Sequence, residues 1–174
     1  MVTKGIKLIH EEEITSAVSS VTVDNVFTDA YQFYKVYFSG LKGSDSTGDT
    51  VKFQFLVSNS ADTNSEYDRD NIYGTTNGAG GMGGSYNQNH FYISNLNNGT
   101  GATSSASLII ANTRNTDQTQ TIAKTIWSYT NTYNFYGMHM ALYNTRDVAQ
   151  TGFKIFMDSH TLTAGKILVF GLVD

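Results

Sequence analysis

Tyr31–Leu41 reads Tyr-Gln-Phe-Tyr-Lys-Val-Tyr-Phe-Ser-Gly-Leu, and Val51–Val57 reads Val-Lys-Phe-Gln-Phe-Leu-Val. Successive side chains of a β-strand point to opposite faces, so alternation along a segment predicts which face is buried. The second stretch has both Phe and both Val on one face, which predicts a half-buried strand. The first has aromatic side chains on both faces, which predicts a central strand covered on both sides. The polar turn Gly43–Gly48 between them predicts a hairpin with a longer loop.

Similar short runs, separated by polar turns, occupy most of the remaining chain. Glu11–Val18 could form one or two helical turns, but no convincing helix is found. The pattern predicts an all-β fold, an antiparallel, jelly-roll-like β-sandwich of about eight to ten strands. It also predicts one domain over residues 1–174, with an N-terminal arm at 1–14 and a flexible Gly-rich loop at 74–86. The other runs are Gly5–His10, Ser19–Asp24, Asn71–Gly74, His90–Leu96, Ser105–Asn112, Ile122–Tyr129, Phe135–Asn144, Gly152–Ser159 and Lys166–Val173.

The composition excludes several functional classes. Charged residues make up 15% of the chain, and aromatic residues make up 13%. The 11 Lys and Arg are scattered and the net charge is −4, so we expect no nucleic-acid partner. No segment approaches the ~20 apolar residues of a membrane span, and Met1–Gly5 lacks a signal-peptide core. We therefore expect no membrane partner and no export by a signal peptide.

The absence of both Cys and Pro carries further information. Without Cys, the chain has no disulfide, no catalytic thiol and no Cys-ligated zinc. Without Pro, exposed edge strands need another form of protection, such as pairing with a neighbour.

The Gly-rich segment contains a formal dinucleotide-binding pattern, GxGxxG, at Gly78–Gly83. That motif works only after a hydrophobic strand and before a helix that meets the pyrophosphate. Ser85–Asn89 is a poor start for an amphipathic helix. The segment is more simply a mobile or tightly turned loop, because Gly adopts positive φ freely. Such a loop could become ordered against a neighbouring subunit.

No catalytic, cofactor-binding or metal-binding residue is assigned from the sequence, and we expect the chain not to be an enzyme. Asp62–Asp70 offers alternating oxygen ligands, but Tyr67 and Tyr73 occupy the positions where an EF-hand needs Gly and Glu. A different calcium site and a solvated acidic loop both remain as interpretations. The chain has no GxSxG motif. The four histidines have no metal-ligand spacing; they are His10, His90, His139 and His160.

Aromatic side chains could form a platform that stacks against sugars, and Tyr86, Tyr133 and Tyr136 lie near turns where exposure is expected. Most of the other aromatic residues are more simply explained as core or cross-strand packing.

Three motifs carry a resemblance to a known family. They are Thr15–Asp24 followed by the Tyr34–Phe38 strand, Val51–Val57 leading to Ser65–Tyr67, and the closing strand Ala164–Leu172. In this order they resemble accessory virion proteins of tailed bacteriophages of the marine and cyanobacterial type. The Gly74–Gly84 insertion is not part of that pattern, and Phe170 stands where Tyr is more common.

The resemblance implies a virion structural protein on the capsid surface, assembled in the host cytoplasm. We expect a capsid decoration or cement protein that binds the major capsid protein or another virion protein. The resemblance favours three copies around a local three-fold axis. The alternative is a tail-associated receptor- or carbohydrate-binding module. Within Val2–Ile14 and Gly74–Tyr86, the expected partner contacts are Ile6, Leu8, Ile9, Met82 and Tyr86.

Overall fold

The computed structural model describes residues 5–44, 49–76, 78–96, 103–114, 119–128, 135–145 and 147–173. The described residues form strands and connecting turns, with no helix among them, and so none that could span a membrane. The strands are β1 (Gly5–Ile14), β2 (Ser20–Val23), β3 (Phe33–Gly43), β4 (Asp49–Val57), β5 (Ser60–Ala61), β6 (Tyr67–Thr75), β7 (Gly80–Gln88), β8 (Phe91–Leu96), β9 (Ser104–Ala111), β10 (Thr119–Ser128), β11 (Phe135–Asn144), β12 (Gly152–Phe156) and β13 (Leu162–Val173).

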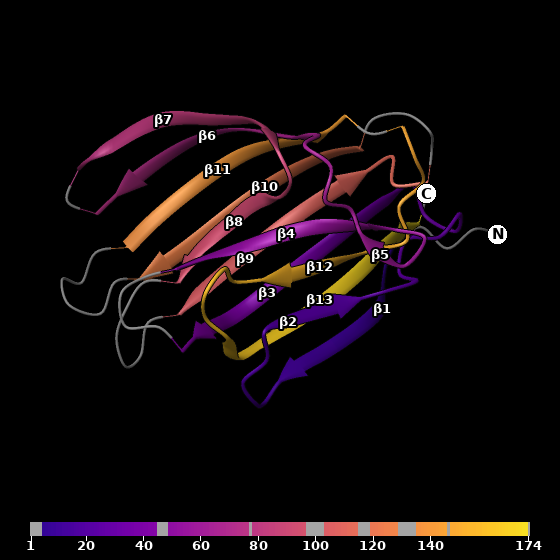
Figure 1. Ribbon diagram of the computed structural model, residues 1–174, viewed down its shortest axis with the longest axis horizontal. Helices are drawn as coiled ribbons and strands as arrows, with labels where there is room; N and C mark the ends of the chain where they lie inside the picture. The colour runs from indigo at the N-terminus through magenta and orange to yellow at the C-terminus, as the bar shows by residue number, and fades with distance from the viewer. Residues whose placement is uncertain are drawn as a thin grey trace.

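The strands form two antiparallel sheets that pack face to face (Figure 1). The large sheet has eight strands in the order β1-β13-β3-β9-β10-β11-β6-β7. The small sheet has the order β2-β12-β4-β5, and β8 pairs with β4 on the same side as β5. The predicted all-β sandwich is therefore confirmed.

The connectivity explains the jelly-roll character of the sandwich. Half of the large sheet, β1-β13-β3-β9, faces the strands β2, β12, β4 and β8 of the small sheet. In chain order, these eight strands cross repeatedly between the two sheets, as in a jelly roll of two Greek keys. The remaining strands β10, β11, β6 and β7 extend the large sheet on one side. This extension ends at β7, which forms the rim of the molecule in Figure 1.

The core between the sheets is dominated by aromatic side chains. Phe53 stacks on Phe153 with ring centroids 5.1 Å apart, and Tyr67 meets Phe91 edge-on at 4.8 Å. The buried hydroxyl of Tyr67 accepts a hydrogen bond from the Phe55 amide (3.0 Å) and donates one to the Asp62 carbonyl (3.1 Å). Offset and edge-to-face ring pairs stabilise a core beyond the area that they bury. These contacts tie the extension of the large sheet, through β6, to the small sheet.

The predicted hairpin between the first two quoted stretches is wrong. β3 pairs with β13 and β9 in the large sheet, whereas β4 belongs to the small sheet. Their burial is also the reverse of the prediction. The outward face of β3 is half-exposed, while Lys52, Gln54 and Leu56 on the outward face of β4 are buried. The polar side chains of β4 tolerate burial because Lys52 pairs with Asp158 and Gln54 donates to the Asn89 carbonyl (2.7 Å).

The N-terminal arm and the Gly-rich loop are both strands. A strand was already expected at Gly5–His10, so the strands absent from the predicted runs are β5 and β7. β1 pairs with β13 from Gly5 to Ile14, so only residues 1–4 of the expected arm lie outside the described residues. β6 and β7 pair with each other as a hairpin. Gly78 closes its turn with φ = +83°, and its amide donates to the Thr75 carbonyl (3.1 Å). The sequence did not predict β7, because a run of Gly has low strand propensity.

Candidate functional site

The outward side of the large sheet carries rows of apolar side chains across β1, β13, β3 and β9. Directly opposed residues of antiparallel strands point to the same face. The register therefore aligns Ile6, Leu172, Phe33 and Ala111 in one row, and Leu8, Phe170, Lys35 and Ile109 in the next. Leu168 and Tyr37 lie in a third row, where the Tyr37 ring meets Phe170 edge-on at 5.9 Å. We call the apolar members of these rows the docking face.

Much of the docking face is exposed in the isolated chain. The exposed fractions are 62% for Ile6, 45% for Leu8, 41% for Phe33 and 42% for Ile109. Large contiguous apolar patches are uncommon on monomeric proteins and mark sites of association. Four of the exposed large hydrophobic residues thus gather on one end of one sheet.

Charged groups lie both at the margin of the docking face and within it. Lys166 forms an ion pair with Glu11 at one margin, and the hydrogen bond to Glu11 raises the pKa of Lys166. Lys35 stands within the face, between Phe170 and Ile109, and its ammonium lies 4.7 Å from the centre of the Tyr37 ring. The long apolar stem of a Lys side chain can lie on an apolar surface while its charge stays in water.

A second apolar surface lies on the same outward side, at the β6–β7 end of the sheet. Ile72 (62% exposed) faces Met82 (83% exposed) across the hairpin, beside Tyr86 (58% exposed). The Tyr86 hydroxyl donates to the Asp70 carboxylate (2.7 Å), and this bond raises the pKa of Tyr86. These residues border an open depression of about 590 Å³ with His139. We call this the hairpin surface.

The glycines of β7 make room for side chains of β6 and of β7 itself. A Cβ on Gly81 would lie 2.8 Å from the Tyr73 hydroxyl oxygen. A Cβ on Gly84 would lie 2.7 Å from an Asp70 carboxylate oxygen and 3.1 Å from the Tyr86 hydroxyl. The close approach of these side chains therefore explains why the β7 strand is rich in Gly.

Four of the five expected contact residues are exposed, but they lie in two separate places. Ile6 and Leu8 belong to the docking face, and Met82 and Tyr86 belong to the hairpin surface at the opposite end of the large sheet. Ile9 instead packs against the core, because side chains alternate along a strand and Ile9 points away from the face of Leu8. The sequence reasoning missed Phe33 and Ile109, because both faces of the Tyr31–Leu41 strand were expected to be covered and Ile109 was not assigned to a face.

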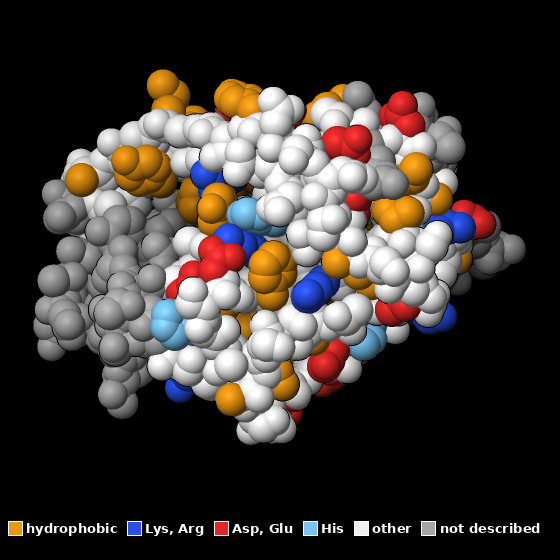
Figure 2. All heavy atoms as spheres, viewed as in Figure 1, with side chains coloured by type: hydrophobic (Ala, Val, Ile, Leu, Met, Phe, Trp, Pro, Cys, Tyr) orange, Lys and Arg blue, Asp and Glu red, His pale blue; other side chains and the backbone are white. Residues whose placement is uncertain are grey.

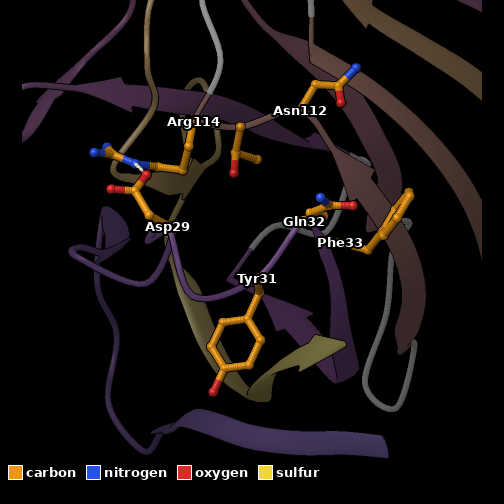
Figure 3. A pocket seen from close by; sticks show the side chains of 7 residues that line it. Asp29, Tyr31, Gln32, Phe33, Asn112 and Arg114 are labelled. Carbon is orange, nitrogen blue, oxygen red and sulfur yellow. Dashed lines mark hydrogen bonds and ion pairs between the residues drawn. The ribbon is translucent and has the colours of Figure 1, made fainter. Parts of the chain in front are cut away.

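A polar pocket of about 340 Å³ adjoins the docking face at Phe33 (Figure 3). The Nε of Arg114 donates to the Asp29 carboxylate (3.1 Å) on one side of the pocket. The amides of Gln32 and Asn112 lie on the other side with the Phe33 ring. Asn112 has φ = +62°, a conformation that non-Gly residues adopt mainly where the surrounding structure requires it. Amides, an ion pair and an aromatic ring are groups that suit a hydroxyl-rich ligand.

A charged cluster lies on the outward side of the small sheet, where Figure 2 shows basic, acidic and His side chains gathered near the middle of the visible face. Lys52 pairs with Asp158, and Tyr92 lies between Lys52 (5.5 Å) and the Arg69 guanidinium (4.9 Å). Burial, followed by the charge of Lys52, lowers the pKa of His90 to about 4. Burial also lowers the pKa of Arg69. His90 is therefore neutral at pH 7.

The other candidates from the sequence do not converge on a catalytic or metal site. In the Asp62–Asp70 segment, Asp62 is buried and accepts a hydrogen bond from the Asn64 amide (3.2 Å), while Asp68 and Asp70 lie in β6. Across the described parts of the chain, no three His, Asp or Glu side chains gather to hold a metal ion. The GxGxxG pattern runs into β7 rather than into a helix. Tyr133 lies outside the described residues, and the Tyr136 side chain is not described.

No protein-family model matches the sequence, and no curated protein matches it either.

Proposed function

We propose that this chain is a non-enzymatic structural protein of a bacteriophage virion, a decoration or cement protein that binds the capsid through the docking face. The docking face is the observation that carries the proposal. The sequence resemblance supplies the virion setting, with the major capsid protein or a neighbouring virion protein as partner.

The physical basis of the proposal is burial of exposed apolar surface. The backbone of Ile6, Leu8, Phe33 and Ile109 is already ordered in strands, so it loses little conformational freedom on binding. A rigid patch of this kind gives affinity without a large ordering cost. A protein that binds only the assembled shell stabilises that shell by mass action. This mechanism needs no reacting group.

The charged groups elsewhere support a structural role rather than a catalytic one. Asp158 is paired with Lys52, and the Asp49 carboxylate interacts with His160 (3.2 Å). A general acid or base needs a pKa near the working pH and access to substrate. His90 fails on both counts, because it is 9% exposed and its pKa is about 4.

Quantitative mass spectrometry of purified particles from the source phage tests the proposal. The expected result is a copy number in a fixed simple ratio to the major capsid protein. Trace amounts, or a number matching the tail fibres, would contradict the capsid assignment.

The pocket in Figure 3 favours a second candidate, a carbohydrate-binding module on the tail. Its amides, ion pair and Phe33 ring match the chemistry of a saccharide subsite. A glycan array with the isolated protein would then show binding that Gln32→Ala and Arg114→Gln reduce at least tenfold. Ile6→Ser should leave that binding unchanged, because Ile6 lies outside the pocket. Absence of any glycan signal would remove this candidate.

A further inference from the structure

The two edges of the large sheet differ in how they are protected against strand pairing. An exposed edge strand is usually blocked by a bulge, by charges, by Pro or by a short length. β1 has a bulge at Leu8/His10, and it carries Lys7 and the three acids Glu11, Glu12 and Glu13. β7 also has an irregularity, an extra residue between Ser85 and Gln88 opposite Tyr67/Arg69, but its Gly80–Gly84 part is regular, and the strand contains no Lys, Arg, Asp, Glu or Pro.

β7 has one partner, and its other side is open. No described segment pairs with it except β6, and Figure 1 shows β7 at the rim of the sheet. The neutral, regular stretch Gly80–Gly84 at this open edge is a template for another strand.

The hairpin register identifies the backbone groups that point outward. The Thr75 amide donates to the Ala79 carbonyl (2.8 Å), so these two residues form a hydrogen-bonded pair. Hydrogen-bonded and non-hydrogen-bonded pairs alternate along an antiparallel ladder. Gly80, Met82 and Gly84 therefore belong to non-hydrogen-bonded pairs. Their amide and carbonyl groups point away from β6, toward the open side.

We propose that β7 is a homotypic interface: it pairs antiparallel with β7 of a second copy, and joins the two large sheets into one continuous sheet. The residues from Gly80 to Gly84 supply the backbone hydrogen bonds. The inference does not rest on the virion assignment, because it follows from the sheet edge alone.

The composition of β7 favours a second copy as the occupant. An isologous pair places the strand against an identical strand, so a strand with charges of one sign would repel itself. Gly80–Gln88 carries no charge, whereas β1 has three consecutive Glu. Self-pairing is thus unopposed at β7 and opposed at β1.

This interface gives two-fold symmetry, in place of the three copies that the family resemblance implies. It also leaves the docking face free, because β7 and β1 lie at opposite ends of the sheet. Two copies joined through β7 would therefore present two docking faces.

Sedimentation equilibrium with a matched pair of variants at Met82 tests the proposal. Met82→Pro removes an outward amide and leaves the β6 ladder intact, since Met82 faces Ile72 in a non-hydrogen-bonded pair. Met82→Ala removes the side chain but keeps the amide. The expected result is a wild-type dimer whose dissociation constant rises roughly tenfold or more in Met82→Pro, with a smaller change in Met82→Ala.

Hydrogen exchange of the wild-type chain, followed by NMR, gives an independent test that needs no variant. Dimerisation should slow exchange of the Met82 and Gly84 amides as concentration rises, and leave the inward Gly83 amide unchanged. A monomer at all concentrations, a trimer, or equal dimerisation of wild type and folded Met82→Pro would overturn the proposal. Concentration-independent exchange at Met82 would do the same.

Discussion

Replacing Ile6 and Leu8 together by Ser should weaken binding to the capsid and leave the fold almost unchanged. Both side chains lie on the outward face of β1, where they are 62% and 45% exposed in the isolated chain. Ser keeps the strand neutral and adds no bulk. Because about half of each side chain is already covered within the fold, we expect the free energy of unfolding to fall by about 1–3 kcal/mol while the chain stays folded.

The size of the binding effect follows from the exposed fractions. Full burial of a Leu or Ile side chain is worth about 1.5–3 kcal/mol. The exposed parts of Ile6 and Leu8 amount to about one whole side chain. Losing that burial should raise the dissociation constant about 10- to 150-fold per copy.

The assay is titration of purified chain onto particles made by a phage that lacks the gene, with bound chain measured by co-sedimentation. Ile72→Ser is the matched control, because Ile72 is also 62% exposed on the outward face but lies at the β6–β7 end. The control should bind like wild type. Equal binding of wild type and Ile6→Ser/Leu8→Ser, or equal losses in both variants, would refute the reasoning.

Two further predictions concern stability. Tyr67→Phe leaves the buried Phe55 amide and Asp62 carbonyl without this hydroxyl, and should lower the free energy of unfolding by about 1–3 kcal/mol in urea titrations. Tyr37→Phe, on the docking face, should change it by less than about 0.5 kcal/mol, and similar losses in both would contradict the assignment. The pKa of His90 is about 4 in the folded chain and about 6.5 in the unfolded chain. Between these two pH values, only the unfolded state binds a proton at His90. Stability should therefore fall, by up to about 3 kcal/mol, as the pH drops from about 6.5 to about 4. His90→Gln should flatten that part of the profile, and an unchanged profile would show that His90 is not its source.

Local alternation was sufficient to locate most strands but not to pair them. β3 and β4 were both recognised, yet their membership of different sheets depends on partners that lie far away in the chain, β9, β12 and β13. The burial of Lys52 was also invisible locally, because its partner Asp158 lies 106 residues further along. Alternation along a strand shows which side chains share a face, whereas pairing with distant strands decides which of the two faces is covered by the rest of the protein.

The candidate site was predicted in part for the same reason. Ile6 and Leu8 attracted attention because they are apolar residues beside three acids. Phe33 and Ile109 could not be assigned to the same surface, because their alignment requires the order β1-β13-β3-β9. β7 was missed because the space that its glycines leave is filled by side chains such as Tyr73, which pattern analysis does not capture.

Cryo-electron microscopy of the source particle tests the central claim most directly. The account predicts density for this chain at regular positions on the capsid, with Ile6, Leu8, Phe33 and Ile109 buried against the shell. Density confined to the tail, absence from the particle, or a capsid-bound chain whose docking face points to solvent would contradict it.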